Sequence, residues 1–432
     1  MTPERLGKAQ DDKPIETDVE IEEEGLNVLI DLEAELTTHL NRLCVEIGPR
    51  PLGSPGDHAA ADYIQGVFRG AGLDMEVQEF NCPAWEHQTT RLTLHGKVVE
   101  AAANAFSPPC DVSAPSVAVG TVSELEAADL EGRIGILYGD LTKTPLSPKS
   151  WFLKSERDDR VIRLLEDKNP AALITVQSRP GDLERVIADW EFHIPSAAVP
   201  ARVGLALLQR GAPTLHLRIQ SQETPGHTCN VVARQAGQGQ TRIVLCAHYD
   251  TTIDTPGALD NAAGAAVLLA LAQSLSQSRL RHGLECIAFS GHEYLPLGDD
   301  EYLRRCGDQL EEILVAINFD AVGQYLGANS IAMFASSQVF RDQVVEITKG
   351  YPGVVWVDPW PQSNHSTFSM RGVPAIALSS EGRIRLDHLR VDSVEWVSPA
   401  KLEEAVSLVT AIVESLQDKS SGWAREGSLS RN

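Results

Sequence analysis

Residues 242–277, RIVLCAHYDTTIDTPGALDNAAGAAVLLALAQSLSQ, decide the fold of this chain. The opening run RIVLCAH is apolar almost throughout and has the length of a strand, which is typical of a strand buried on both faces of a sheet. A loop rich in Thr, Asp, Pro and Gly follows it, and AAGAAVLLALAQSLSQ (262–277) then has the pattern of an apolar helix. The stretch therefore predicts a buried strand, a polar loop and a core helix, in that order.

The same alternation continues through the second half of the chain. Further apolar runs of strand length are NVVARQ (230–235), LECIAFS (284–290), ILVAINFD (313–320), SIAMFAS (330–336) and PAIALSS (374–380). Helical segments lie between and after them at 340–351 and 399–416, the latter with Pro399 in its first turn. This pattern predicts an α/β fold with a mostly parallel, twisted sheet covered by helices on both faces.

The first half of the chain contains two segments with different sequence patterns. Residues 26–46 and the segment after GPRPLGSPGD (48–57) have helical periodicity, and DMEVQEF (74–80) alternates as a strand. From 96 to 226 short β-like runs replace this pattern, with few candidate catalytic residues. We therefore expect an acidic disordered tail at 1–25, a main domain made of 26–95 and 227–418, a smaller β-rich inserted domain at 96–226, and a flexible tail at 419–432.

The charge and composition of the chain predict which partners it lacks and where in the cell it is located. The net charge is −23, and a surface this acidic repels nucleic acid and anionic membranes. The N-terminus lacks the apolar segment of a secretory signal, and no run reaches the roughly 18 apolar residues of a spanning helix. The seven cysteines are scattered without a C-x-x-C motif, and Cys246 and Cys286 lie inside apolar runs as expected for core residues. A cytoplasmic location is the prediction.

Side chains of metal-ligand and acid–base type follow four of the predicted strands. They are, in chain order, His248 with Asp250, Asp260 in the next loop, His292 with Glu293, Asp320, and the group Asp387, His388 and Asp392. In an open α/β sheet the carboxyl ends of the strands meet at one edge, where ligand sites collect. The repetition therefore predicts a functional site at this edge.

Each of these residues also has a structural explanation when taken alone. Asp260 could cap the helix that follows it, Asp320 could simply end a strand, and His388 could be an ordinary loop histidine. Together, two histidines and three carboxylates suit a pair of divalent ions; zinc is favoured, with Co²⁺ or Mn²⁺ as alternatives. Asp250, two residues after His248, is expected to accept a hydrogen bond from that histidine and to orient it.

These motifs resemble the di-zinc aminopeptidases of peptidase clan MH, a family that also includes glutamate carboxypeptidases and relatives of glutaminyl cyclase. The motifs that carry the resemblance are AHYDT (247–251), GALDNAAGAAVLL (257–269), GHE (291–293) with Gly298, INFDAVG (317–323), SNHSTFSMRGVPAIAL (363–378) and DHLRVDS (387–393). GPRPLGSPGDHAAADYIQGVFRGAGL (48–73) is similar to the family's N-terminal segment, so the likeness covers about 26–95 and 227–417. VGTVSELEAADLEGRIGILYG (119–139) resembles a protease-associated domain, which the family commonly carries as an insertion.

The resemblance implies a role for each matching residue. His248 and Asp320 would be terminal ligands of one zinc ion, Glu293 and His388 those of the other, and Asp260 would bridge the two. His365, in SNHSTF, is the alternative for the last ligand; the family motif favours His388 and leaves His365 at the border of the site. Asp392 matches a family aspartate that supports the ligands.

Two positions depart from the family pattern. The family has Glu-Glu where this chain has His292-Glu293, and the first glutamate is the general base. Asn364 also replaces a family aspartate. A neutral imidazole can accept a proton near neutral pH, so we expect His292 and Asp250 to serve as catalytic residues. Alternatively Glu301, or an acid of the Asp299-Asp300 pair, could supply the base, although a solvated helix start is the plainer explanation of these acids.

The function implied by the resemblance is hydrolysis of N-terminal residues of peptides, through a hydroxide held by two zinc ions. Three alternatives stay open: a catalytically weak or inactive metal-binding homologue, a carboxypeptidase, and a cyclase-like acyltransferase with one zinc. A carboxypeptidase would need a basic pocket for the substrate carboxylate, and four arginines lie near the last motifs: Arg371, Arg383, Arg385 and Arg390. The sequence leaves the side-chain preference, the role of the insertion and the oligomeric state open.

Overall fold

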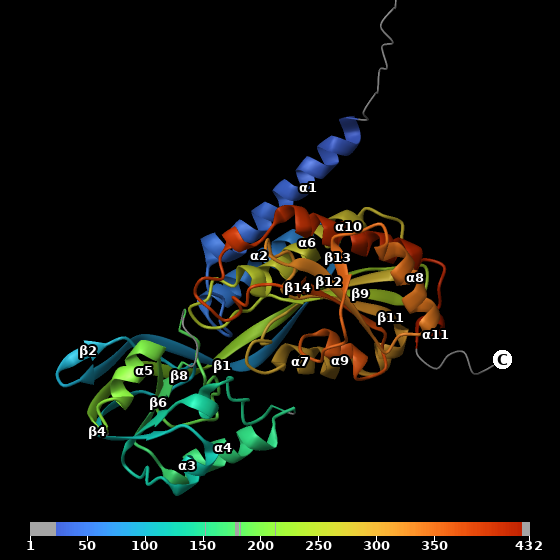
Figure 1. The fold of residues 1–432 in the computed structure, drawn as a ribbon. Helices are drawn as coiled ribbons and strands as arrows, with labels where there is room; N and C mark the ends of the chain where they lie inside the picture. Colours follow the sequence, from blue (N-terminus) through green and yellow to red (C-terminus); the bar gives the residue numbers. More distant parts are fainter. Residues whose placement is uncertain (1–22, 152, 178–180, 182, 212, 426–432) are drawn as a thin grey trace, which may run out of the picture.

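The computed structural model describes residues 23–151, 153–177, 181, 183–211 and 213–425. A large twisted β-sheet with helices on both faces forms the main body, and a smaller lobe projects from it (Figure 1). The predicted α/β fold class is therefore confirmed.

Parallel strands form the centre of the sheet, in the order β14, β11, β9, β10. Their bounds are β9 Arg242–His248, β10 Gly283–Phe289, β11 Ile313–Phe319 and β14 Ala375–Glu381. Antiparallel pairs flank this centre: β12 beside β14 on one side, continued by β13, and β8 beside β10 on the other. These strands are β8 Thr214–Gln235, β12 Ala328–Phe334 and β13 Val354–Trp356. Both faces of the central strands are buried, which explains their continuous apolar runs.

Helices cover the two faces of the sheet in separate layers (Figure 1). The larger layer contains α1 Glu23–Asn41 with the π-helical turn Arg42–Ile47, α2 Pro55–Gly70, α6 Ala263–Ser276, α8 Gln338–Thr348 and α10 Pro399–Ser415. The opposite layer contains α7 Leu297–Cys306 and α9 His365–Ser369. Alternate residues of each strand serve the two layers: Leu245 packs beneath α6, and Cys246 packs toward α7 and α9.

Helix α6 is the centre of the larger layer. It is apolar on all sides because the sheet, α1, α2 and α10 all surround it. The segment Ala258–Ser276 has the length and hydropathy of a membrane-spanning helix, but 89% of it is buried inside the protein. This segment is therefore a helix of the protein core. The cytoplasmic location stays a prediction.

Two long strands connect the main body to the smaller lobe. β1 (Asp74–Leu94) and β8 pair antiparallel from Asp74↔Arg234 to Leu94↔Leu215, and they run through both parts (Figure 1). The expected domain boundary at 226/227 falls inside β8, which continues through Pro225 and Gly226 in register with β1. Gly226 is needed there because a Cβ would lie 2.7 Å from the Cβ of Ala84.

The smaller lobe contains most of residues 96–213. Its strands are β2 Lys97–Val99, β3 Ala102–Ala103, β4 Cys110–Val119, β5 Ile134–Leu137, β6 Ala172–Val176 and β7 Ser196–Val199. Its helices are α3 Val122–Ala127, α4 Glu156–Lys168 and α5 Ala201–Leu208. The lobe has its own apolar clusters. Its assignment as an inserted, protease-associated-like domain stays a prediction.

The ends of the chain differ in part from the expected tails. Most of the predicted acidic tail lies outside the described residues, and its last three positions, 23–25, begin α1. At the other end, where a flexible tail was expected from 419, Ser421–Ala424 form the short helix α11. Ala424 is fully buried and the Trp423 ring contacts that of Phe340 at 5.5 Å, so apolar packing holds this segment.

Candidate metal centre

Three of the predicted ligands follow neighbouring parallel strands. His248 is the last residue of β9, Asp320 directly follows β11, and Glu293 lies four residues beyond β10. Because β9 lies between β10 and β11, the three side chains meet at the carboxyl edge of the sheet.

The other two predicted ligands reach the same place from loops. Asp260 lies in a π-helical turn, Ala258–Ala262, at the start of α6. His388 lies in the loop after β14 and has a left-handed backbone conformation, with φ of 63°. Neither position follows from strand order, so only the folded loops bring these side chains to the strand ends.

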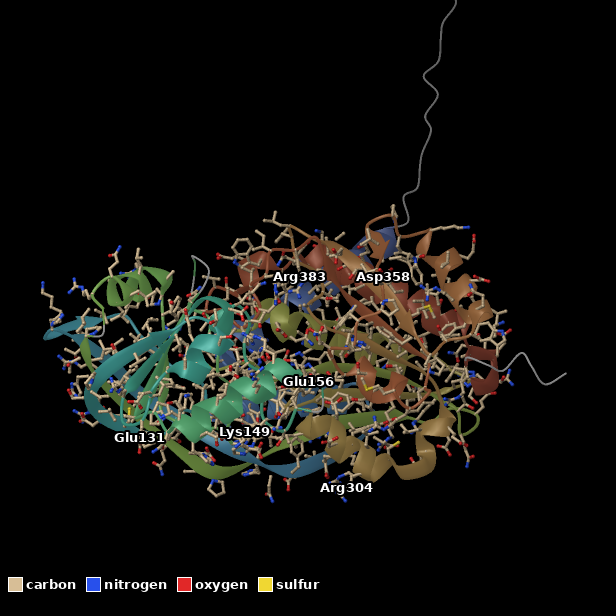
Figure 2. All side chains as sticks on the ribbon, turned by 60° about the horizontal axis from the view of Figure 1, so that its bottom comes forward. Glu131, Lys149, Glu156, Arg304, Asp358 and Arg383 are labelled. Carbon is tan, nitrogen blue, oxygen red and sulfur yellow. The ribbon has the colours of Figure 1, made fainter. Side chains whose placement is uncertain are left out.

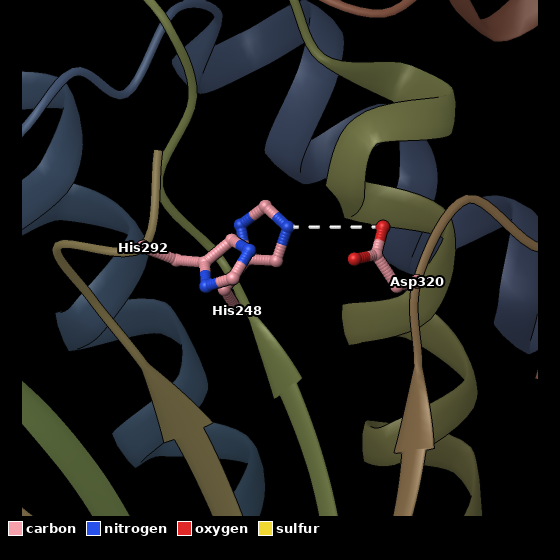
Figure 3. A group of neighbouring side chains, drawn as sticks. All are labelled: His248, His292 and Asp320. Atoms are coloured by element: carbon pink, nitrogen blue, oxygen red, sulfur yellow. Dashed lines mark ion pairs between the residues drawn. The ribbon is translucent and has the colours of Figure 1, made fainter. Parts of the chain in front are cut away.

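The carboxylate of Asp260 lies between the two histidines. His248 Nε2 is 3.2 Å from Asp260 Oδ1, and His388 Nε2 is 3.5 Å from Asp260 Oδ2. On the outer sides, His248 Nε2 is 3.9 Å from Asp320 Oδ1, the pair dashed in Figure 3, and His388 Nε2 is 3.1 Å from Glu293 Oε2. One oxygen of Asp260 thus faces each histidine–carboxylate pair, which is the arrangement of a bridging ligand.

The donor set fits divalent metal ions. His248 Nε2 is buried and has no hydrogen-bond partner among the described residues, although it points into a group of carboxylates. Ligand atoms of His248, Asp260 and Glu293 lie within 4.8 Å of one another, as do those of His248, His292 and Asp320. Imidazole nitrogen and carboxylate oxygen are the donors that zinc prefers when cysteine is absent.

The predicted ligands His248, Asp260, Glu293, Asp320 and His388 are called the cluster below. The pKa shifts of its two histidines indicate that the cluster attracts positive charge. Burial lowers the pKa of His248, but Asp250, Asp260 and Asp320 outweigh this effect and raise it well above the usual value. At His388, whose side chain is 47% exposed, desolvation is outweighed by the charges of Glu293 and Asp260, which raise the pKa to about 10. Without a metal ion, protons on the histidines neutralise the carboxylates; a divalent cation satisfies the same need.

Asp250 lies beside His248, beyond the end of β9. His248 Nδ1 is 3.3 Å from the backbone carbonyl oxygen of Asp250, whereas Asp250 Oδ1 is 3.5 Å away and has no hydrogen-bond partner among the described residues. Its Oδ2 accepts hydrogen bonds from the backbone N–H groups of His292 and Glu293, at 3.0 and 3.1 Å. The fully buried carboxylate therefore fixes the loop that carries His292 and Glu293, and the backbone carbonyl of the same residue contacts His248.

Asp392 holds the Asp260 turn. Its carboxylate accepts hydrogen bonds from Leu259 N–H at 2.8 Å and from Asp260 N–H at 3.0 Å. It thus supports the predicted bridging residue through the backbone of that residue's own turn.

Two further supporting residues were missed by the sequence analysis. Arg50 is fully buried and donates to the carbonyl groups of Tyr249, Pro256 and Gly257, so it holds the loop between β9 and Asp260. Asn261 donates to Phe319 O at 2.8 Å and accepts from Gly264 N–H at 3.0 Å, which ties the Asp260 turn to β11. Arg50 lies in the stretch 48–73, which resembles the family's N-terminal segment, but no role was expected for its side chain.

His365 does not join the cluster. It is fully buried, its Nε2 lies 2.7 Å from Trp360 O, and its ring contacts that of Phe334 at 4.4 Å. Burial lowers the pKa of His365 to about 4. Among the described residues no hydrogen bond or ion pair connects it to the five predicted ligands, so the geometry favours His388 over His365.

His292 lies beside His248, with 4.3 Å between the ring centroids (Figure 3). Burial, followed by the charge of His248, lowers the pKa of His292. Its Nδ1 lies 3.3 Å from Asn364 Nδ2, so the two positions that depart from the family pattern are in contact.

Two of the acids named as an alternative base, Asp299 and Glu301, have other partners. Asp299 was expected to be solvated, but it is only 2% exposed because it accepts hydrogen bonds from Asn364 and Thr367. Glu301 points elsewhere and forms ion pairs with Arg304 and Arg305 at 2.7 and 2.6 Å.

Two cavities open at the cluster. The larger, of about 1100 Å³, is lined by His292, Glu293 and His388 together with Trp356, Asp358 and Arg383. Asp358 and Arg383 are on the main body in Figure 2, apart from Glu131 and Lys149 of the smaller lobe. The second, of about 370 Å³, lies between the cluster and the smaller lobe, and its lining includes Leu146, Trp151, Ile253 and Tyr294. The cluster is therefore open to a ligand the size of a short peptide.

Comparison with known proteins gives a consistent set of similarities. Residues 230–413 match the family described as "Peptidase family M28". The chain is 27% identical over 319 residues to "Probable lipoprotein aminopeptidase LpqL" of Mycobacterium tuberculosis, a match that covers 67% of this chain and 60% of that protein. It is 24% identical over 404 residues to aminopeptidase YwaD of Bacillus subtilis, covering 87% and 82% of the two chains. The chain thus spans less than two thirds of LpqL but most of YwaD.

Solved structures share the fold. BSAP, a zinc aminopeptidase from Bacillus subtilis, superposes with a TM-score of 0.75 at 22% identity and covers 91% of this chain and 98% of its own. A peptidase M28 precursor from Shewanella amazonensis gives a TM-score of 0.73 at 19% identity, over 90% and 96% of the two chains. Both likenesses extend over the main body and the smaller lobe.

Proposed function

From the match of residues 230–413 to peptidase family M28, we propose that the chain is a metal-dependent aminopeptidase that removes N-terminal residues from peptides. The observation that carries the proposal is the position of Asp260, with one carboxylate oxygen toward His248 and the other toward His388. Similar proteins named aminopeptidases support the substrate class.

Five residues would hold the metal ions. His248 and Asp320 would bind one ion, Glu293 and His388 the other, and Asp260 would bridge them. We propose two Zn²⁺ ions, since the donors are two imidazoles and three carboxylates and the fold neighbour BSAP is named a zinc aminopeptidase. When bound, two such ions acidify a water molecule and polarise a substrate carbonyl.

The residues around the cluster suit the N-terminus of a peptide. The larger cavity carries the exposed acids Asp358 and Glu381 on its wall, and these carboxylates attract the protonated α-amine. Asp250 holds the loop of His292 and Glu293 rigidly, so the ligands and the His292 imidazole keep a constant orientation toward the substrate.

A carboxypeptidase is less well supported, because three of the four nearby arginines are already engaged. Arg371 donates to Thr367 O, Arg383 pairs with Asp387, and Arg390 pairs with Asp254 at 2.7 Å. Arg385, at 76% exposure, lies 4.0 Å from Asp387. A buried guanidinium free to bind a substrate carboxylate is not found among these four.

A matched set of substrates tests the proposal. Purified protein loaded with zinc should hydrolyse leucine p-nitroanilide but not its N-acetylated form, and 1,10-phenanthroline should abolish the rate until zinc is restored. An N-blocked dipeptide cleaved instead would indicate a carboxypeptidase. If zinc-loaded protein turns over no aminoacyl, acyl or dipeptide substrate, the chain is a metal-binding protein without peptidase activity.

A further inference from the structure

A chain of three polar side chains runs from the helix layer of α7 and α9 to the metal cluster. Asp299, at 2% exposure, accepts hydrogen bonds from Asn364 Nδ2 at 3.1 Å and 2.9 Å through its two carboxylate oxygens. The Thr367 hydroxyl also donates to Asp299. Asn364, at 1% exposure, faces His292 on its other side, with 3.3 Å between Asn364 Nδ2 and His292 Nδ1.

The orientation of the Asn364 amide is decided by the carboxylate. An amide oxygen cannot donate to a carboxylate, so the atom that faces Asp299 is the amino group. Asn364 Oδ1 is buried and has no hydrogen-bond partner among the described residues, whereas the amino group has two. One N–H of Asn364 is used by Asp299, and the second is directed at His292.

The second N–H decides which nitrogen of His292 carries a proton. Because Asn364 presents a donor, His292 Nδ1 must present its lone pair. A neutral imidazole has one proton, and it then lies on Nε2, the nitrogen on the other side of the ring. We propose that Asn364 and Asp299 are positioning residues that hold His292 as an Nε2–H donor toward the metal cluster, neither a metal ligand nor a general base.

This inference separates three roles that were open for His292. A metal ligand or a proton acceptor needs a free lone pair on Nε2, which would require a proton on Nδ1 facing the Asn364 amino group. An Nε2–H group instead donates a hydrogen bond to an oxygen in the site, as a neutral histidine does when it stabilises negative charge developing on a substrate oxygen. The catalytic part of the inference rests on the proposed peptidase activity; the tautomer does not. The sequence-based expectation of a histidine base is replaced by that of a donor.

The tautomer can be observed directly by NMR. Protein labelled with ¹⁵N-histidine should show, in a long-range ¹H–¹⁵N correlation spectrum at neutral pH, a protonated Nε2 and an unprotonated Nδ1 for His292. The signals are assigned by their disappearance in His292→Gln, and the spectrum is recorded with zinc and after chelation. A protonated Nδ1 in the zinc-loaded protein would overturn the inference.

Two neighbouring carboxylates on α7 provide a matched pair of variants. Asp299→Asn removes the acceptor that orients Asn364, so its amide can turn, and the tautomers of His292 should become mixed. Asp300→Asn changes an adjacent acid that has no hydrogen bond to Asn364, and it should leave the His292 signals unchanged. Equal spectra for wild type and Asp299→Asn would remove Asp299 from the proposed chain.

The kcat values of variants at His292 distinguish a hydrogen-bond donor from a general base at this position. Gln can donate from its amide, so His292→Gln should keep kcat within about tenfold, whereas His292→Ala should lose about 10²–10³-fold. His292→Glu supplies an acceptor and should not exceed His292→Gln. The inference is contradicted if Glu restores the rate and Gln does not. If the wild-type protein is inactive on every substrate, the proposed function fails, and the NMR result still decides the tautomer.

Discussion

At the scale of single residues, the position of Asp260 depends on groups that never touch a substrate. Asp392 accepts from its backbone N–H and Asn261 ties its turn to β11. The helix-cap explanation for Asp260 is not supported, because it is Asn261 that accepts a hydrogen bond from the first turn of α6, from Gly264 N–H at 3.0 Å. Burying a carboxylate away from water costs free energy. The position of Asp260, with its oxygens toward two histidines, is therefore stable only when cations lie nearby.

Removing this carboxylate should remove metal. We expect Asp260→Ala to lose bound zinc, and His248→Ala to lose it as well, because each variant deletes a donor that the remaining residues cannot replace. Elemental analysis after dialysis measures the stoichiometry. Asp358→Asn, a change at an exposed acid on the cavity wall, should keep the wild-type metal content. Full retention in Asp260→Ala would remove the proposed site.

A second residue-scale prediction concerns Asp57, which is fully buried beneath the loop after β10. Burial raises its pKa to about 7, although Thr228, Ser290 and the Gly53 N–H lower it. The folded state therefore keeps a proton that the unfolded state loses near pH 4, and the free energy of unfolding should fall as pH rises from about 4 to about 7.

Asp57→Asn should flatten this part of the pH profile. The difference between the variant and wild type across the window is on the order of 4 kcal/mol, from a pKa that moves from 3.8 to about 7. Urea unfolding at a series of pH values measures it, and Asp62→Asn, at an exposed position of the same helix, is the control. Parallel profiles for Asp57→Asn and wild type would contradict the prediction.

At the scale of elements, the start of α6 is the point where fold and site depend on each other. A Cβ at Gly264 would lie 2.4 Å from both Asn261 Oδ1 and Phe319 O, so the helix can approach β11 only with glycine there. This close approach brings the Asp260 turn against the end of β11, next to Asp320.

Gly264→Ala should therefore reduce both stability and metal content. Overpacking at this contact should cost about 1–3 kcal/mol and displace the Asp260 turn. Gly66→Ala, in α2, is the matched control: no atom lies within 4 Å of its Cβ, and the helix should gain up to about 1 kcal/mol. Thermal unfolding and metal analysis of the two variants measure the contrast. A stabilised Gly264→Ala that binds zinc normally would contradict it.

At the scale of the whole molecule, the smaller lobe contacts the loop that leads into the metal cluster. Arg185 of the lobe donates to Ala103 O at 2.9 Å, to Ile253 O at 3.3 Å and to Asp254 Oδ2 at 2.7 Å. Ile253 lines the cavity between the lobe and the cluster. The lobe therefore forms part of the wall that a substrate would meet.

Arg185→Ala should loosen this loop without unfolding the main body. We expect faster hydrogen exchange at residues 251–256 and a lower kcat/KM, with a small change in Tm, because the central sheet is untouched. Arg163→Ala, at a 74% exposed position of the same lobe, should leave both unchanged. Equal exchange in the two variants would show that the lobe does not restrain the site.

Much of this architecture follows from local patterns in the chain. The apolar runs of β9, β10, β11 and β14 and the all-round apolar α6 predict a covered parallel sheet, and residues directly after strands are bound to meet at its edge. The continuity of β8 could not be predicted, because Pro225 and Gly226 look like a break until Pro83 and Ala84 are placed opposite them.

The sequence by itself determined the fold class and the ligand-type residues, since hydrophobic period and strand-end position are local properties. Tertiary structure alone decided that His388 rather than His365 faces Asp260, that Arg50 and Asn261 hold the loops, and that Asp299 is buried. It also brought Asn364 to His292, from positions far apart in the chain. Hydrogen bonds between distant loops depend on how the packed elements place their ends, and no local pattern of residues encodes that placement.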